Sequence, residues 1–292
     1  MGTKKAPNAK RTAATARPKK NAAADSASAS NSLARLLGLL DLFTPAAPAW
    51  PIDALIYSNG MSRSTGYRYV KALNDAGLLS AVSNGYYILG PRIIELDRQI
   101  RQCDPLYIAG GPVMKQLVAQ TGHSALLCAL YRNSVLCVRE ELTADRPPNL
   151  FNRGQRRTLF QGAASKIILP FLRPHQLRIL YDKHQKAIAA SGLGVDWASF
   201  RAALAKMRRQ GHVMTIGEFN PGVIGISAPI FNRSKQILGS IGVTGAEEDF
   251  AHGELDGIAN LTKSAARQIT DRIAIVSAGM DRAPRGVGSS IG

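Results

Sequence analysis

The chain lacks any apolar run of the length that a membrane-spanning helix needs, about 20 residues. Its first 31 residues are basic and rich in Ala, Ser, Thr and Pro, and they lack the apolar segment of a secretory signal. These absences predict a cytoplasmic protein without a membrane partner. Because such a low-complexity segment cannot bury enough apolar surface to fold, we expect residues 1–31 to form a disordered basic tail.

Cysteine is scarce as well. Only Cys103, Cys128 and Cys137 occur, and neither their odd number nor their spacing is typical of a disulfide framework or a metal site. Cys128 and Cys137 also fall inside apolar runs that read as strands. We therefore expect buried, reduced thiols.

The sequence contains no recognisable catalytic, phosphate-binding or metal-binding motif. The sequence GAASK at 162–166 lacks the first glycine and the Gly-Lys pair of a phosphate-binding loop. Glu218 has no second carboxylate beside it, and no nucleophile, base and orienting residue combine in a local motif. The histidines have neither HxxxH nor HxH spacing and fit surface or capping positions better than metal ligands: His123, His175, His184, His212 and His252. We expect no enzymatic activity, no metal and no cofactor.

Positive charge, in contrast, is abundant. The 292 residues include 37 Lys and Arg against 20 Asp and Glu, a formal net charge of +17. Residues 1–31 hold seven of these cations and a single acid, Asp25, so most of the excess lies outside the tail. This balance suits a polyanion such as DNA, although charge alone carries no sequence preference. Binding to an anionic membrane surface is the other interpretation of a basic tail.

The most specific pattern lies at 61–90, MSRSTGYRYVKALNDAGLLSAVSNGYYILG. Ser62 suits a helix N-cap, and Gly77 suits the left-handed residue that ends a helix. Between them, four residues at helical spacing predict a buried stripe: Gly66, Tyr69, Val70 and Leu73. The β-rich runs 78–82 and 86–89 flank Ser83-Asn84-Gly85, which is typical of a tight hairpin.

The opposite helix face carries side chains suited to the major groove, because Arg reads guanine edges and Ser or Thr contact phosphates or bases. With the hairpin tip, the predicted DNA-binding residues are Ser62, Arg63, Ser64, Thr65, Tyr67, Arg68, Lys71 and Asn84. An ordinary solvated helix before an ordinary hairpin is the alternative. The upstream pattern favours DNA binding, since an apolar helix with Leu33, Leu36, Leu37 and Leu40 and a short helix at 52–58 precede it. Three helices and a hairpin predict a winged helix-turn-helix domain at 32–90.

The second half predicts a different fold. Pro91 precedes an amphipathic helix at 92–103, which carries Ile93, Ile94, Leu96 and Ile100, and another helix is expected at 106–119. We assign 91–108 to a linker helix, 109–276 to an effector-binding domain and 277–292 to a flexible tail. Strands are expected at 124–131, 134–141, 213–217, 225–231 and 236–244, and helices at 162–172, 174–184, 196–210 and 252–275. Hairpins with separate helices predict an α+β domain with an antiparallel sheet.

The chain resembles the isocitrate lyase regulator (IclR) family of bacterial transcription factors. The resemblance spans about residues 32–275, and seven collinear segments carry it: SLARLLGLLDLF (32–43), SRSTGYRYVKALNDAGLL (62–79), YYILGPRIIEL (86–96), TGHSALLCAL (121–130), GQRRTLFQGAASKIIL (154–169), MRRQGHVMTIGEFNPGVIGISAPIF (207–231) and ILGSIGVTG (237–245). The resemblance implies a winged helix-turn-helix, a linker helix that pairs subunits, and a GAF-like domain that binds a small organic acid. It also implies a homodimer or a dimer of dimers on symmetric operator half-sites.

Effector residues follow from the same resemblance. The backbone N–H groups of Ala163 and Ala164 are expected to bind a carboxylate, and the late strands are expected to complete the site with Thr215, Gly225, Gly242 and Thr244. Family members often show Asp, Cys, Ser and Ser at the last four positions. The two glycines predict a bulkier, less polar acid, for instance an aromatic one. Strand packing or a bulge at Gly225 and Gly242 is the alternative.

Gly66 is a further departure, because a larger apolar residue is usual on the buried face of this helix. It either lets the helix approach the first helix closely or is simply tolerated. The complete hypothesis is a sequence-specific DNA-binding transcriptional regulator whose operator binding a small organic acid modulates. A metabolic enzyme with a basic surface and a protein that coats DNA without sequence preference are the alternatives.

Overall fold

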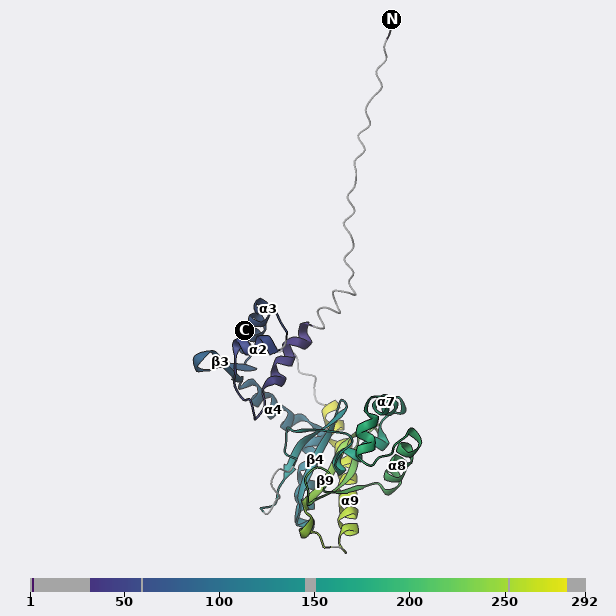
Figure 1. Ribbon diagram of the computed structural model, residues 1–292. Helices are drawn as coiled ribbons and strands as arrows, with labels where there is room; N and C mark the ends of the chain where they lie inside the picture. The colour runs from purple at the N-terminus through teal and green to yellow at the C-terminus, as the bar shows by residue number, and fades with distance from the viewer. Residues whose placement is uncertain (1, 3–31, 59, 145–150, 252, 283–292) are drawn as a thin grey trace. The chain divides into compact units, whose positions relative to one another are not determined.

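The computed structural model describes residue 2, residues 32–58, 60–144, 151–251 and 253–282, with two compact units, Met1–Asp97 and Arg98–Gly292 (Figure 1). The predicted N-terminal tail lies almost entirely outside the described residues, as do residues 283–292 of the predicted C-terminal tail. Residues 277–282, which we had assigned to that tail, instead continue helix α9, Leu255–Arg282.

The first unit is built from short helices and a small antiparallel sheet. Residues 32–38 are helical and lead into a 3-10 turn, η1, at Leu39–Leu42. Helix α2 (Ile52–Ser58) has the predicted bounds, and helix α3 (Arg63–Asp75) follows it. Strands β1 (Trp50–Pro51), β2 (Leu79–Ala81) and β3 (Tyr86–Leu89) pair in the order β1-β3-β2, and the short 3-10 turn η2 (Ser83–Gly85) joins β2 to β3. The winged helix-turn-helix prediction is confirmed, with β1 as an additional strand.

The core of this unit corrects one detail of the sequence analysis. Leu39 is fully buried with Leu55, Ile56 and Val70, whereas Leu33 and Leu37 of the predicted apolar helix face are exposed. The chain tightens from α to 3-10 geometry at Leu39, and a 3-10 helix has fewer residues per turn than the α-helix that the spacing assumed. The buried face therefore falls on a different leucine.

The second unit is an antiparallel sheet between two helical layers. Helix α4 (Arg92–Cys103) contains the division between the units, and α5 (Pro105–Thr121) begins the second unit's core. The strand order is β6-β5-β4-β9-β8-β7, from β4 (Ser124–Tyr131), β5 (Ser134–Glu141), β6 (Arg156–Thr158), β7 (Val213–Ile216), β8 (Val223–Phe231) and β9 (Ile237–Ala246). The predicted α+β class and antiparallel sheet are confirmed.

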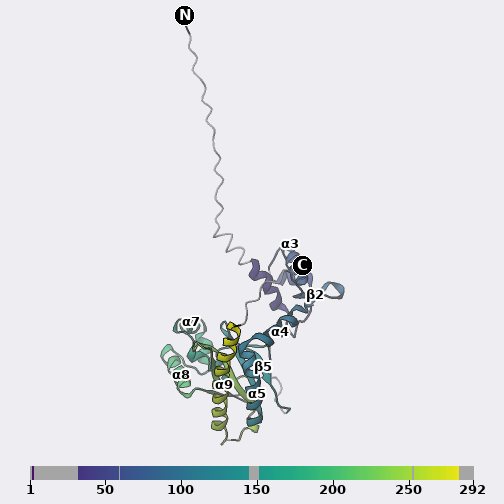
Figure 2. The ribbon, with the colours of Figure 1, turned by 180° about the vertical axis from the view of Figure 1, so that it is seen from behind.

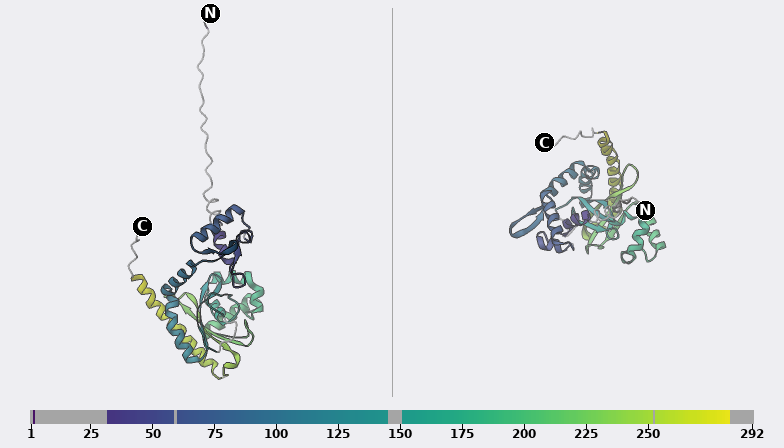
Figure 3. Two further views of the ribbon diagram at one scale, coloured as in Figure 1. Left: turned by 90° about the vertical axis from the view of Figure 1, so that its left-hand side faces the viewer. Right: turned by 90° about the horizontal axis from the view of Figure 1, so that it is seen from above.

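Each strand contributes side chains to both helical layers, since successive side chains of a strand point to opposite faces of the sheet. Leu127 of β4 packs in the cluster with α5 and α9, whereas Cys128 packs in the cluster with α7 (Pro174–Ala190) and α8 (Trp197–Gln210). Helices α5 and α9 lie side by side over one face of the sheet (Figures 2 and 3). The sheet is thus covered on both faces.

Three local expectations are wrong. The helix expected at 162–172 is interrupted: α6 covers only Ala163–Lys166, and a 3-10 turn, η3, follows at Leu169–Phe171 with Pro170 inside it. Pro170 cannot donate a backbone hydrogen bond, which favours this break. Helix α7 runs past the predicted end at 184 through a distorted His184 to Ala190. Strand β6 was not predicted at all. The remaining 3-10 turn, η4, lies at Glu247–Asp249.

Candidate functional sites

The predicted reading surface lies on one face of α3. Ser64, Tyr67, Arg68 and Lys71 are exposed, while the predicted stripe of Gly66, Tyr69, Val70 and Leu73 is buried on the opposite face. Ser62 and Arg63 are exposed at the start of the helix and Thr65 is partly buried there. The helix therefore presents seven of the eight predicted DNA-binding residues together. Asn84 lies apart from them in sequence, at the tip of the β2–β3 hairpin.

Ser62 occupies the N-cap position with an extended backbone, at φ −66° and ψ 149°. Its hydroxyl does not accept a backbone N–H, as we had expected, but donates to Thr65 Oγ1 at 3.0 Å. A hydroxyl can rotate toward either kind of partner, so sequence did not decide between them. The first-turn N–H groups are consequently not capped by this side chain.

The cations on the reading surface differ in their partners. Arg63 Nη2 lies 3.4 Å from Asp53 Oδ1, and Lys71 Nζ lies 2.9 Å from Asp75 Oδ2. Arg68 lies with its guanidinium carbon 5.7 Å from the centre of the Tyr69 ring, and no acidic group of the described chain pairs with it. Arg68 is therefore the cation of α3 whose N–H groups are most available to a ligand.

Gly66 is explained by close packing of α3 on α2. A Cβ added at this glycine would lie 2.4 Å from Ile56 Cγ1, and Ile56 is buried. The close approach is to the second helix, whereas we had considered the first. Any larger residue at position 66 would push α3 away from α2.

The wing tip has the backbone that its sequence predicts. Asn84 and Gly85 have left-handed φ angles of 62° and 72°, and both residues are exposed. Val82 N–H donates to Tyr86 O at 2.8 Å and closes the hairpin. Asn84 is therefore held at the end of a short, defined loop.

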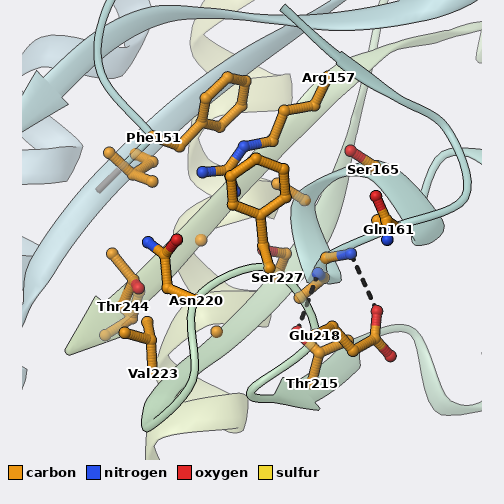
Figure 4. A pocket seen from close by; sticks show the side chains of 18 residues that line it. Phe151, Arg157, Gln161, Ser165, Thr215, Glu218, Asn220, Val223, Ser227 and Thr244 are labelled. Carbon is orange, nitrogen blue, oxygen red and sulfur yellow. Dashed lines mark hydrogen bonds between the residues drawn. The ribbon is translucent and has the colours of Figure 1, made fainter. Parts of the chain in front are cut away.

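A pocket lies in the second unit at the ends of β7, β8 and β9 beside α6 (Figure 4). It encloses about 590 Å³ of space between the lining residues, a volume that includes its open mouth. All six predicted effector positions line it: Ala163, Ala164, Thr215, Gly225, Gly242 and Thr244. The structure thus brings together residues that are up to 81 positions apart, from 163 to 244.

The start of α6 is already hydrogen-bonded to the protein. Ala163 N–H donates to Thr215 Oγ1 at 3.1 Å, and Gly162 N–H donates to Glu218 Oε2 at 3.0 Å. Ala164 N–H, in contrast, has no acceptor among the described residues. Ala163 therefore lines the pocket with its backbone N–H occupied, which the sequence could not show.

The two glycines that line the pocket have different surroundings. A Cβ at Gly242 would lie 2.2 Å from Ser227 Oγ and 3.0 Å from Ile226 O, so a side chain there would displace the Ser227 hydroxyl and crowd the backbone of β8. A Cβ at Gly225 would make only ordinary contacts, at 3.6 Å from Thr215 Oγ1 and 3.7 Å from Ala163 Cβ. The absent side chain at Gly225 leaves room in the pocket, whereas the glycine at 242 reflects strand packing.

Several residues of this pocket were not predicted from the sequence. Arg157 of β6 is half-buried, and its guanidinium carbon lies 4.2 Å and 3.5 Å from the ring centres of Phe151 and Phe219. Glu218 contacts Lys166 Nζ as an ion pair, and Lys166 Nζ also donates to Ser191 O at 2.9 Å. The sequence does not indicate that these residues lie together, because their proximity depends on β6 and on the loop between β7 and β8.

The thiols and one histidine also depart from expectation. Cys128 and Cys137 are buried, free and paired in register across β4 and β5, as expected of buried thiols, but Cys103 is exposed. A hydrogen bond with Cys137 and burial hold the pKa of Cys128 well above its usual value. His123 is buried and stacked on Phe250 at 3.9 Å, which corrects its predicted surface position. Burial lowers the pKa of His123.

No group of three or more His, Cys, Asp or Glu side chains is placed to hold a metal ion in the described part of the chain. No helix of that part combines the length and apolar character that crossing a membrane requires.

Comparison with known proteins matches both halves of the chain to one family. Residues 102–271 match the family described as "Bacterial transcriptional regulator IclR C-terminal", and residues 32–83 match the "IclR helix-turn-helix domain". The HTH-type transcriptional regulator KipR of Bacillus subtilis is 25% identical over 81% of this chain and 94% of its own length.

Solved structures show the same fold. An IclR transcriptional regulator from Alicyclobacillus acidocaldarius superposes with a TM-score of 0.71 at 19% identity, over 84% of this chain and 99% of that one. An IclR homologue from Microbacterium hydrocarbonoxydans, solved as a complex with 4-hydroxybenzoate, gives a TM-score of 0.66 at 19% identity, over 83% and 98% of the two chains.

Proposed function

This chain belongs to the IclR family of bacterial transcriptional regulators, and on that premise we propose that a small organic acid controls its binding to operator DNA. The observation that carries the effector part is the pocket of the second unit, where the half-buried cation Arg157 lies against aromatic rings. A cation beside apolar walls is suited to an organic acid, because it supplies the counter-charge while the walls bury the carbon skeleton. Such a role needs no catalytic step.

The reading surface of α3 supports the DNA part of the proposal. Arg68 is suited to reading a base, since a guanidinium can donate two hydrogen bonds to one guanine. Arg63 and Lys71 are paired with Asp53 and Asp75. Both cations are suited to phosphate contacts, and on binding DNA they would leave these carboxylates for phosphate groups. Ser62, Ser64, Thr65 and Tyr67 supply further donors, and Asn84 of the wing is suited to the backbone or the minor groove.

Three observations favour an aromatic acid as the effector. The pocket contains the rings of Phe151 and Phe219, and Gly225 leaves space on its strand side. The Microbacterium hydrocarbonoxydans homologue was solved with 4-hydroxybenzoate, although at 19% identity it shares only the fold. Ala164 N–H and the Thr215 hydroxyl remain as donors that would position the acid, and Gly242 and Thr244 remain as walls, since the Thr244 hydroxyl donates to Ile224 O.

For an effector to control operator binding, the assembled protein must have two states that differ in their affinity for the operator. An effector changes operator affinity only by the difference between its affinities for the two states. We propose a homodimer or a dimer of dimers, supported by the exposed apolar side chains of α4: Ile94 is 74% exposed and Ile100 is 53% exposed. Two-fold assembly matches symmetric half-sites. The site of action would be the cytoplasm, where bacterial DNA lies.

Footprinting on the DNA upstream of the protein's own gene tests the proposal, at physiological salt and with competitor DNA. We expect a discrete protected palindrome, because specific regulators bind symmetric half-sites. Uniform protection would indicate a protein that coats DNA, and absent protection together with turnover of a metabolite would indicate an enzyme. Either result would overturn the proposal.

A further inference from the structure

Arg157 is the central residue of β6, one of the two edge strands of the large sheet, where it pairs with Val135 of β5. Its neighbours in the strand, Arg156 and Thr158, are exposed, whereas Arg157 is half-buried and reaches the pocket. Figure 4 shows its side chain extending beside Phe151 into the space that the lining residues surround. The alternation of the strand thus selects one of two adjacent arginines for the pocket.

Two rings hold the guanidinium group. Phe151 is buried just before β6, and Phe219 belongs to the loop between β7 and β8. Stacking of a guanidinium on aromatic rings uses its flat faces. The N–H edges lie in the plane of the group, and they donate no hydrogen bond to a described residue. This is the edge that binds a carboxylate through two parallel hydrogen bonds.

The charge of Arg157 has no counter-charge among the residues that the structure describes. No carboxylate of the described residues forms an ion pair with it, and the titratable groups that act on its pKa are the buried thiols of Cys128 and Cys137. Burial lowers the pKa of Arg157 to about 10, so the group remains a cation at neutral pH. A cation that is partly removed from water without a partner is costly, and an anionic ligand would offset that cost.

The other charged lining residue is already neutralised. Glu218 is paired with Lys166, which is 5% exposed, and its second oxygen accepts Gly162 N–H. In Figure 4 the Glu218 carboxylate is turned toward the start of α6, with its hydrogen bond drawn. With this pair balanced, the pocket retains one positive charge, that of Arg157.

We propose that Arg157, held between Phe151 and Phe219, is the residue that recognises the acid group of the effector, and that the pocket selects ligands with a single negative charge. The inference rests on the proposed function and specifies its ligand class. A neutral analogue would leave the guanidinium unpaired. A dianion would place a second carboxylate in a pocket whose one unpaired positive charge, that of Arg157, is already used by the first.

The test measures binding by calorimetry on the full-length chain, with benzoate, its neutral analogue benzamide and the dianion terephthalate as probes. The parent should bind benzoate at least about tenfold more tightly than either analogue, in line with hydrogen bonds to charged groups. Arg157→Gln should abolish the preference for benzoate over benzamide. The matched control is Arg156→Gln, which removes an exposed arginine from the same strand and should keep that preference.

The possible results separate the two proposals. Equal benzoate affinity in Arg157→Gln and Arg156→Gln would overturn the role of Arg157 and leave acid binding intact. Terephthalate binding as tight as benzoate would overturn the single-charge rule. If the parent binds none of the probes, the aromatic effector itself is wrong. A structural role of Arg157 would lower the thermal unfolding midpoint of Arg157→Gln and leave the ratio of benzoate to benzamide affinity unchanged, which also contradicts the proposal.

Discussion

At the scale of single residues, Arg68 and Arg157 stand out from the neighbouring cations of their sites. Arg63, Lys71 and Lys166 each contact a carboxylate, whereas neither Arg68 nor Arg157 has such a partner among the described residues. Their surroundings separate their roles. Arg68 is exposed on a helix face suited to a DNA groove, and Arg157 is half-buried in a pocket suited to a small molecule.

Arg68→Ala should relax the base preference of operator binding. Loss of a bidentate contact to a guanine removes about 1–3 kcal/mol of discrimination at that base pair. The measurement compares affinities for the footprinted operator and for single-base variants of it. Lys71→Ala is the control, since loss of a phosphate contact should weaken all these sequences alike. An unchanged preference in Arg68→Ala would remove Arg68 from the reading role.

Gly66→Ala should destabilise the first unit. The added Cβ, 2.4 Å from Ile56 Cγ1, overpacks a buried contact at a cost of about 1–3 kcal/mol, against a gain of about 1 kcal/mol in helix propensity. We expect a net loss of about 1 kcal/mol in the free energy of unfolding.

The two tryptophans allow this change to be located, because Trp50 lies in the first unit and Trp197 in the second. Urea unfolding of a Trp197→Phe background reports on Trp50 alone. The control is Gly257→Ala in a Trp50→Phe background, since Gly257 lies in α9 and an added Cβ there meets nothing within 4 Å. Stabilisation of the first unit by Gly66→Ala would show that α2 and α3 are not in this close contact.

At the scale of elements, the loop between β7 and β8 is tied to α6 by Glu218. Its carboxylate accepts Gly162 N–H and pairs with Lys166, while the neighbouring Phe219 ring covers Arg157. One loop thus neutralises a buried lysine and shapes the pocket wall. Loop and helix together set the electrostatics of the site.

Glu218→Gln should destabilise the second unit by about 1–3 kcal/mol, because the amide keeps an acceptor for Gly162 N–H but leaves buried Lys166 without a counter-charge. The value is below that of a fully buried pair because Glu218 is partly exposed. Trp197 fluorescence in a Trp50→Phe background follows the unfolding, with Glu248→Gln as a control at an exposed acid. Equal stability of the two variants would contradict the structural role of the pair.

The elements differ in how far the sequence predicts them. Helix α2 and the hairpin around Asn84 were predicted closely, because periodicity and turn residues fix them locally. The break after Lys166 was missed, since apolar spacing continues across Pro170 while the backbone does not. Strand β6 was missed because three residues carry no periodicity.

The pocket was predicted only in part for the same physical reason. Ala163, Thr215 and Thr244 could be carried over from a family pattern. Arg157 becomes a pocket residue only when β6 pairs with β5 and Phe219 folds over it, and these contacts are non-local.

At the scale of the whole molecule, the charge of +17 supports DNA binding beyond the reading helix. Removal of residues 1–31, which carry seven cations and one acid, should weaken binding to all DNA sequences. The slope of log K against log salt should flatten by up to about 0.9 for each tail cation that contacts a phosphate. The footprint should stay the same, and a changed footprint would give the tail a reading role.

The central claim joins the two units: an acid in the pocket controls DNA affinity at the reading helix. Fluorescence anisotropy tests it directly, with the footprinted operator fragment, the parent chain and Arg157→Gln, each with and without saturating benzoate. We predict that benzoate changes the operator Kd of the parent at least about fivefold, the lower end of typical coupling energies, and leaves that of Arg157→Gln unchanged. An operator Kd of the parent that is the same with and without bound benzoate would contradict the account.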